Sequence, residues 1–138
     1  MFREGRLAFL ALPANAPKDL ASSMKTVLES HGLQAFQPSD LDAGTNLVDS
    51  IQSALRESDV VIADITGKNS NVLFEVGLAI GLRKPVLLLS QGPLDELPSD
   101  LRAYQVASYS PDDSSTVSRY LALWLRDVLT QKSSSVAY

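Results

Sequence analysis

The chain has 138 residues, of which 45% are apolar, and its formal net charge is −4. This length suits one packed domain, which we place at residues 1–130, with residues 131–138 as a disordered tail. The absence of cysteine excludes disulfides and thiolate chemistry, and the single histidine argues against a metal centre. The dispersed, slightly acidic charge argues against nucleic-acid binding.

Hydropathy along the chain bears on its compartment. No apolar run has the length of a membrane-spanning helix, and the apolar stretch near the amino terminus is broken too soon by prolines to be a signal peptide. We therefore expect a cytoplasmic protein that has no membrane partner and requires neither a cofactor nor a metal.

The first half of the chain alternates between strand and helix patterns. Residues 7–12 form a continuous apolar run, which is typical of a strand buried on both faces. Residues 18–30 repeat apolar side chains at helical spacing, and residues 33–36 indicate a short second strand. A second amphipathic helix is predicted over residues 47–55.

The second half continues this alternation. Residues 60–63 and 85–89 are the apolar runs of central parallel strands, and the helical segment 72–82 lies between them. Residues 105–109 indicate a weaker strand, and the spacing of apolar residues over 117–128 predicts a closing helix.

Five strands that alternate with four helices predict an α/β fold. We expect a flavodoxin-like or Rossmann-like three-layer sandwich, with a five-stranded parallel sheet of order 2-1-3-4-5 and helices on both faces. Such sheets bind ligands at the carboxyl ends of the strands beside the switch point, here between strands one and three. This selects three segments, residues 12–15, 39–45 and 64–71.

The richest of these segments follows the third strand. Asp64 ends the strand, and Thr66, Asn69 and Asn71 place hydrogen-bonding side chains in the turn after it, beside the flexible Gly67. An alternative is structural, because aspartate and threonine commonly satisfy turn amides and asparagine commonly caps helices. In the other two segments, the residues that follow strands one and two are candidates for binding because of their position alone: Pro13, Ala14, Asn15 and Asp40.

Glu75 is the only charged residue on the apolar helix that follows this turn. A carboxylate in such surroundings costs free energy unless it is paired, hydrogen-bonded or faces a polar cavity, so it is a candidate for function. Asn71 lies four residues earlier on the same helical face and is expected to orient it. The alternative is a partly solvated glutamate stabilised by the helix dipole. Gly77 and Gly81 predict close packing against the sheet or a partner chain.

The stretch from Ser58 to Ala79 resembles the nucleoside 2-deoxyribosyltransferase-like superfamily. The residues that carry the resemblance are Asp64, Thr66-Gly67, Asn69 and Asn71-Val72 with Glu75 on the helix. The resemblance implies that Glu75 is the nucleophile that attacks the anomeric carbon of a nucleoside, and that Asp64 is the strand-end aspartate of the site. TIR domains are more distantly similar, with a glutamate on the corresponding helix that serves in cleaving the glycosidic bond of NAD.

Our leading hypothesis is an N-glycosidase or glycosyltransferase that acts on a small nucleoside, nucleotide or NAD-like ligand. Glu75 and Asp64 are the expected catalytic residues, and Thr66, Asn69 and Asn71 the expected contacts to sugar or base. The alternatives are a non-catalytic nucleotide sensor, a TIR-like interaction module or a structural adaptor. A homodimer or higher homo-oligomer is also expected, because the helix that carries Glu75 is too apolar for an exposed surface.

Overall fold

One parallel sheet in the order β2-β1-β3-β4-β5 organises the chain, and this confirms the predicted topology. The computed structural model describes residues 6–40, 47–92 and 104–135. The strands in chain order are β1 (Arg6–Ala11), β2 (Leu33–Phe36), β3 (Val60–Asp64), β4 (Val86–Ser90) and β5 (Gln105–Ser108). The switch point lies between β1 and β3, whose register pairs Ala11 with Ala63.

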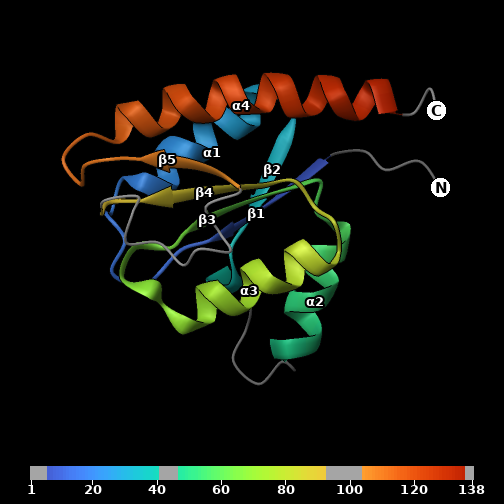
Figure 1. Cartoon of the computed structure of the whole chain (residues 1–138), viewed down its shortest axis with the longest axis horizontal. Coiled ribbons are helices and arrows are strands. Elements are labelled where there is room, and N and C mark those ends of the chain that lie inside the picture. Colours follow the sequence, from blue (N-terminus) through green and yellow to red (C-terminus); the bar gives the residue numbers. More distant parts are fainter. Residues whose placement is uncertain (1–5, 41–46, 93–103, 136–138) are drawn as a thin grey trace.

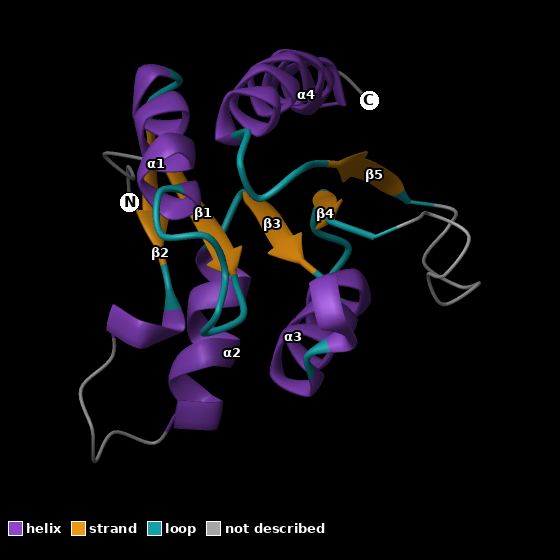
Figure 2. Cartoon of the chain, turned by 90° about the vertical axis from the view of Figure 1, so that its left-hand side faces the viewer, coloured by secondary structure: helices purple, strands orange, loops and turns teal. Residues whose placement is uncertain are grey.

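Helices cover both faces of the sheet. Figures 1 and 2 show α1 (Leu20–Ser30) and α4 (Ser114–Ser135) on one side, and α2 (Leu47–Glu57) and α3 (Ser70–Gly81) on the other. Two short 3₁₀ helices, η1 (Pro38–Asp40) and η2 (Thr66–Lys68), follow β2 and β3. The result is the predicted flavodoxin-like, three-layer α/β fold.

The core has two halves because both faces of the sheet are covered. Alternate strand residues such as Leu10 and Ile62 pack under α1 and α4, whereas Phe9 and Val61 pack under α2 and α3. All five residues of β3 are buried. This double burial explains why the central strands appear in the sequence as unbroken apolar runs.

The closing helix is longer than its apolar stripe predicted. It continues to Ser135, so the backbone of residues 131–135 is helical where we expected a tail, and residues 136–138 lie outside the described part of the chain. The added turns contain no glycine or proline that would interrupt the hydrogen-bond ladder. None of the described helices combines the length and apolarity needed to cross a membrane.

The predicted packing around α3 needs a correction. Phe74 and Leu82 are exposed, so only one side of α3 is buried against the sheet within a single chain. A Cβ added at Gly77 or Gly81 would meet nothing within 4 Å. The chain's own packing therefore does not require these glycines, because α3 is an outer layer and the sheet covers only its inner face.

Candidate active site

A cavity of about 490 Å³ opens at the carboxyl ends of the strands, on the α2 and α3 side of the switch point. Its size lies in the range of small-molecule sites. The exits of β1 and β2 and one side each of α2 and α3 supply its lining: Leu10, Leu12, Pro13, Ala14, Gln37, Pro38, Ser39, Leu47, Val48, Ile51, Asn69, Asn71, Val72, Phe74 and Glu75. This is the location that the topology predicted.

Glu75 brings the only charged group to the described lining of this cavity. Its side chain is 5% exposed, and no hydrogen bond or ion pair joins it to another of the described residues. Burial raises its pKa from the ordinary 4.5 to about 7, because the ionised form loses hydration that none of the described residues replaces. A carboxylate in this state is poised to react with, or stabilise, a cationic centre.

The two asparagines of the turn have different positions. Asn71 is exposed and lines the cavity with Glu75, but within the described part of the chain no hydrogen bond joins them, so the expected orienting contact is not formed. Asn69 also lines the cavity, and its Oδ1 accepts a hydrogen bond of 3.1 Å from the backbone N–H of Val72. Asn69 is therefore the N-cap of α3, which fixes the start of the helix that carries Glu75.

Asp64 is not among the residues that line this cavity. The side chain is 0% exposed. Its Oδ1 accepts from the backbone N–H of Thr66 at 3.0 Å and from the Thr66 hydroxyl at 2.5 Å, and its Oδ2 accepts from the Tyr109 hydroxyl. In this conformation Asp64 holds the turn after β3, in which Gly67 supplies a left-handed residue with φ 74°.

Two residues that the sequence did not single out complete this network. The backbone N–H of Gln91 donates to the Thr66 hydroxyl at 3.0 Å, and the Gln91 side-chain amide donates to the Tyr109 hydroxyl at 3.1 Å. Burial and the bond to Asp64 raise the pKa of Tyr109 to about 12, which keeps its proton in place. The resulting ring of Asp64, Thr66, Gln91 and Tyr109 ties together the ends of β3, β4 and β5. The sequence signal available for this network was that each of the three strands ends in a polar residue or is followed by one.

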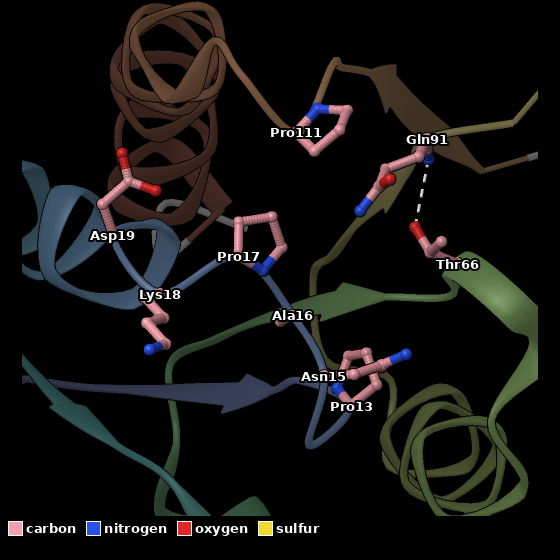
Figure 3. Close-up of a pocket in the computed structure, with 9 residues that line it drawn as sticks. All are labelled: Pro13, Asn15, Ala16, Pro17, Lys18, Asp19, Thr66, Gln91 and Pro111. Atoms are coloured by element: carbon pink, nitrogen blue, oxygen red, sulfur yellow. Dashed lines mark hydrogen bonds between the residues drawn. The ribbon is translucent and has the colours of Figure 1, made fainter.

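The other binding candidates lie on both sides of the β1 exit. Pro13 and Ala14 line the cavity of Glu75, whereas Asn15 and Thr66 line a second cavity of about 430 Å³, which Figure 3 shows and which also reaches Pro13. Asp40 ends η1, but its side chain and residues 41–45 lie outside the described residues. Among the described histidine, aspartate and glutamate residues, no three are grouped so as to hold a metal.

Comparisons with known proteins relate the chain to one group of enzymes. The family model of nucleoside 2-deoxyribosyltransferase matches residues 8–100. No curated protein matches the sequence.

Three solved structures resemble the fold. The CMP N-glycosidase of Clostridium botulinum has a TM-score of 0.63 at 19% identity, over 86% of this chain and 99% of that one. A 2-deoxyribosyltransferase from Bacillus psychrosaccharolyticus has a TM-score of 0.60 at 19% identity, over 81% and 90%. A 2-deoxyribosyltransferase from Leishmania mexicana has a TM-score of 0.54 at 20% identity, over 63% of this chain and 65% of that one, so the match spans just under two thirds of the Leishmania protein.

The raised pKa of Glu75 predicts how stability depends on pH. Between about pH 4.5 and 7 the folded protein holds a proton that the unfolded chain releases, so the free energy of unfolding should fall as pH rises through this interval and level off above pH 7. Glu75→Gln should lose this component. Urea unfolding of both proteins at pH 5 and pH 8 measures it, and a difference between them that is the same at both pH values would contradict the assignment.

The ring around Asp64 predicts a stability cost for Tyr109→Phe. Removing the hydroxyl leaves the buried Asp64 carboxylate short of a donor, which should lower the free energy of unfolding by about 1–3 kcal/mol. Tyr104→Phe is a matched control at an exposed tyrosine, for which we expect a change within about 0.5 kcal/mol. Urea denaturation measures the free energy of unfolding of both variants. Equal losses would mean that the hydrogen-bonded ring of Asp64, Thr66, Gln91 and Tyr109 contributes nothing to stability.

Proposed function

The chain belongs to the nucleoside 2-deoxyribosyltransferase family, and from this premise we propose that it cleaves the N-glycosidic bond of a nucleoside, nucleotide or NAD-like compound with Glu75 as the nucleophile. The observation that supports this most directly is the position of Glu75. Glu75 lines a ligand-sized cavity at the switch point, and its carboxyl group has no partner among the described residues. A structural carboxylate would be expected to have one.

The chemistry follows from the charge that develops at the sugar. As the bond between the anomeric carbon and the base nitrogen breaks, its electron pair leaves with the base and the sugar becomes an oxocarbenium-like cation. A Glu75 oxygen then bonds to the anomeric carbon or stabilises its charge. Water as the next reactant would make the protein a hydrolase, and a second base would make it a transferase.

The remaining candidates have supporting roles in this proposal. Asn69 and Asn71 present amides beside Glu75 that can bind sugar hydroxyls, and Pro13 and Ala14 border the space for the base. Asp64 is proposed as a positioning residue, because its oxygens already bind Thr66 and Tyr109. It would act through the turn that starts α3.

We expect Glu75→Gln to lower the rate of base release by at least about 10²-fold, because the amide cannot form the sugar ester. In the wild type, the rate should rise with pH around an apparent pKa of about 7 as the carboxyl ionises. Mass spectrometry of a panel of nucleosides, nucleoside monophosphates and NAD measures the released base.

Glu29→Gln, an exposed glutamate on α1, is the matched control and should keep full activity. Full activity in Glu75→Gln would refute the role of Glu75. A ligand that raises the melting temperature but is never consumed would favour the non-catalytic sensor.

We also propose a homodimer that covers the open side of the cavity. Its rim is lined by Leu47, Val48 and Phe74, which are 50%, 53% and 52% exposed. Exposing three large apolar side chains in one patch to water is costly in free energy. The outer face of α3, with Gly77 and Gly81, continues this surface without a charged side chain. A second copy presents the same apolar patch and fits it by symmetry.

Phe74→Glu should therefore shift the protein toward the monomer, because the charge would have to be buried in the interface. Leu123→Glu, at an equally exposed position on α4, should leave the assembly unchanged. Sedimentation velocity over a range of concentrations gives the measurement. Equal assembly of both variants would exclude this face.

A further inference from the structure

The second cavity, of about 430 Å³, is built from other residues than the cavity of Glu75. Its described lining comes from the loop between β1 and α1, the turn after β3, the residue after β4 and the loop before α4. Pro13 is the only described residue that lines both cavities. The role proposed for Glu75 makes no use of this second space, although its volume lies in the range of small-molecule sites.

Gln91 presents an oriented amide to this cavity. The Tyr109 hydroxyl donates its proton to Asp64 and keeps it, because the pKa of Tyr109 is raised to about 12. Toward Gln91 the same oxygen therefore accepts, and the Gln91 Nε2 donates to it at 3.1 Å. This bond uses one of the two N–H groups of the amide. The other N–H and the carbonyl oxygen have no hydrogen bond to other described residues, so a donor and an acceptor remain side by side.

The surroundings of this amide suit a flat, uncharged ligand. In Figure 3 the side chain of Gln91 points toward the rings of Pro17 and Pro111, which are rigid apolar walls. The charged residues of the lining, Lys18 and Asp19, lie at the other end of the cavity, away from Gln91. The ligand that fits the Gln91 end is therefore a neutral planar heterocycle whose edge carries a donor beside an acceptor.

A glutamine amide pairs with adenine in this way, because its oxygen accepts from the N6 amino group while its N–H donates to N7. We propose that the second cavity is a separate binding site for a free adenine-type base, with the base edge on the Gln91 amide and the ring faces against Pro17 and Pro111. Asn15 also lines the cavity, and its amide, which has no hydrogen bond to other described residues, can bond a remaining ring nitrogen. The site goes beyond the proposed function, since the base binds without a sugar and without contact to Glu75.

The ring around Asp64 prepares this site for its ligand. It holds Gln91 at two points, since the Gln91 backbone N–H donates to Thr66 and the side chain donates to Tyr109. Without the Tyr109 hydroxyl the amide can rotate, and the entropy of fixing it is then lost on binding. Tyr109→Phe should therefore weaken binding of the base at least about threefold, although Tyr109 is not among the residues that line the cavity.

Calorimetry with two bases that carry no sugar tests the site apart from any turnover. The wild type should bind 9-methyladenine at least about fivefold more tightly than 9-methylpurine, which has the same rings but lacks the amino donor. Gln91→Leu should remove this preference, because it removes the pairing amide. Gln34→Leu, at an exposed glutamine of β2 outside the lining, is the matched control and should keep it. Glu75→Gln should bind 9-methyladenine within about twofold of the wild type, since Glu75 does not line this cavity.

Each outcome decides for or against the site. No binding of 9-methyladenine, equal affinity for the two bases, a preference that survives Gln91→Leu, or binding that is lost in Glu75→Gln overturns the inference. Where Gln91→Leu does not fold, Tyr109→Phe decides in its place, and an unchanged affinity in that variant overturns the inference. The proposed function is judged separately by base release from nucleosides, so either proposal can fail while the other stands.

Discussion

The carboxyl group of Asp64, at the end of the central strand, has no access to solvent. Such a group is tolerated only where hydrogen bonds replace its hydration, and here donors come from Thr66 and Tyr109. These bonds fix the turn after β3, the turn places the N-cap Asn69, and the N-cap sets where α3 begins. The position of Glu75 over the cavity therefore depends on a buried interaction on the other side of the turn.

The same short segment thus contains two buried carboxylates in opposite states. Asp64 is surrounded by donors, whereas Glu75 has only the space of the cavity in front of it and a pKa raised to about 7. The network of Thr66 and Tyr109 supplies donors to the Asp64 carboxyl group, whereas none of the described residues donates to Glu75. A carboxylate without donors is costly in the free protein, and a ligand that brings developing positive charge to it, as proposed above, would relieve that cost.

The sequence predicted the sheet order and the edge of the sheet at which the cavity of Glu75 opens, because doubly buried strands and the turns after them have strong local signals. It did not predict the partners of Asp64. Gln91 and Tyr109 come next to it only through the strand register, which pairs Asp64 with Leu89 and Ser90 with Ser108. This register cannot be deduced from the sequence of any single segment. The glycines of α3 left their neighbour open for a related reason. Gly77 and Gly81 indicate a place for a close neighbour, but a helix pattern does not say whether the neighbour belongs to the same chain.

The apolar rim and the Glu75 carboxyl group belong to one cavity, so the proposed dimer would link assembly to ligand binding. Leu47, Val48 and Phe74 form the open side of the space that Glu75 faces. A second chain that covers this rim would lower the local dielectric around Glu75 and strengthen its interaction with a cationic sugar. A ligand that filled the cavity would in turn present part of the surface that the second chain meets. In the proposed dimer each event would change the free energy of the other, so ligand affinity and dimer affinity would be thermodynamically coupled, each depending on the concentration of the other component.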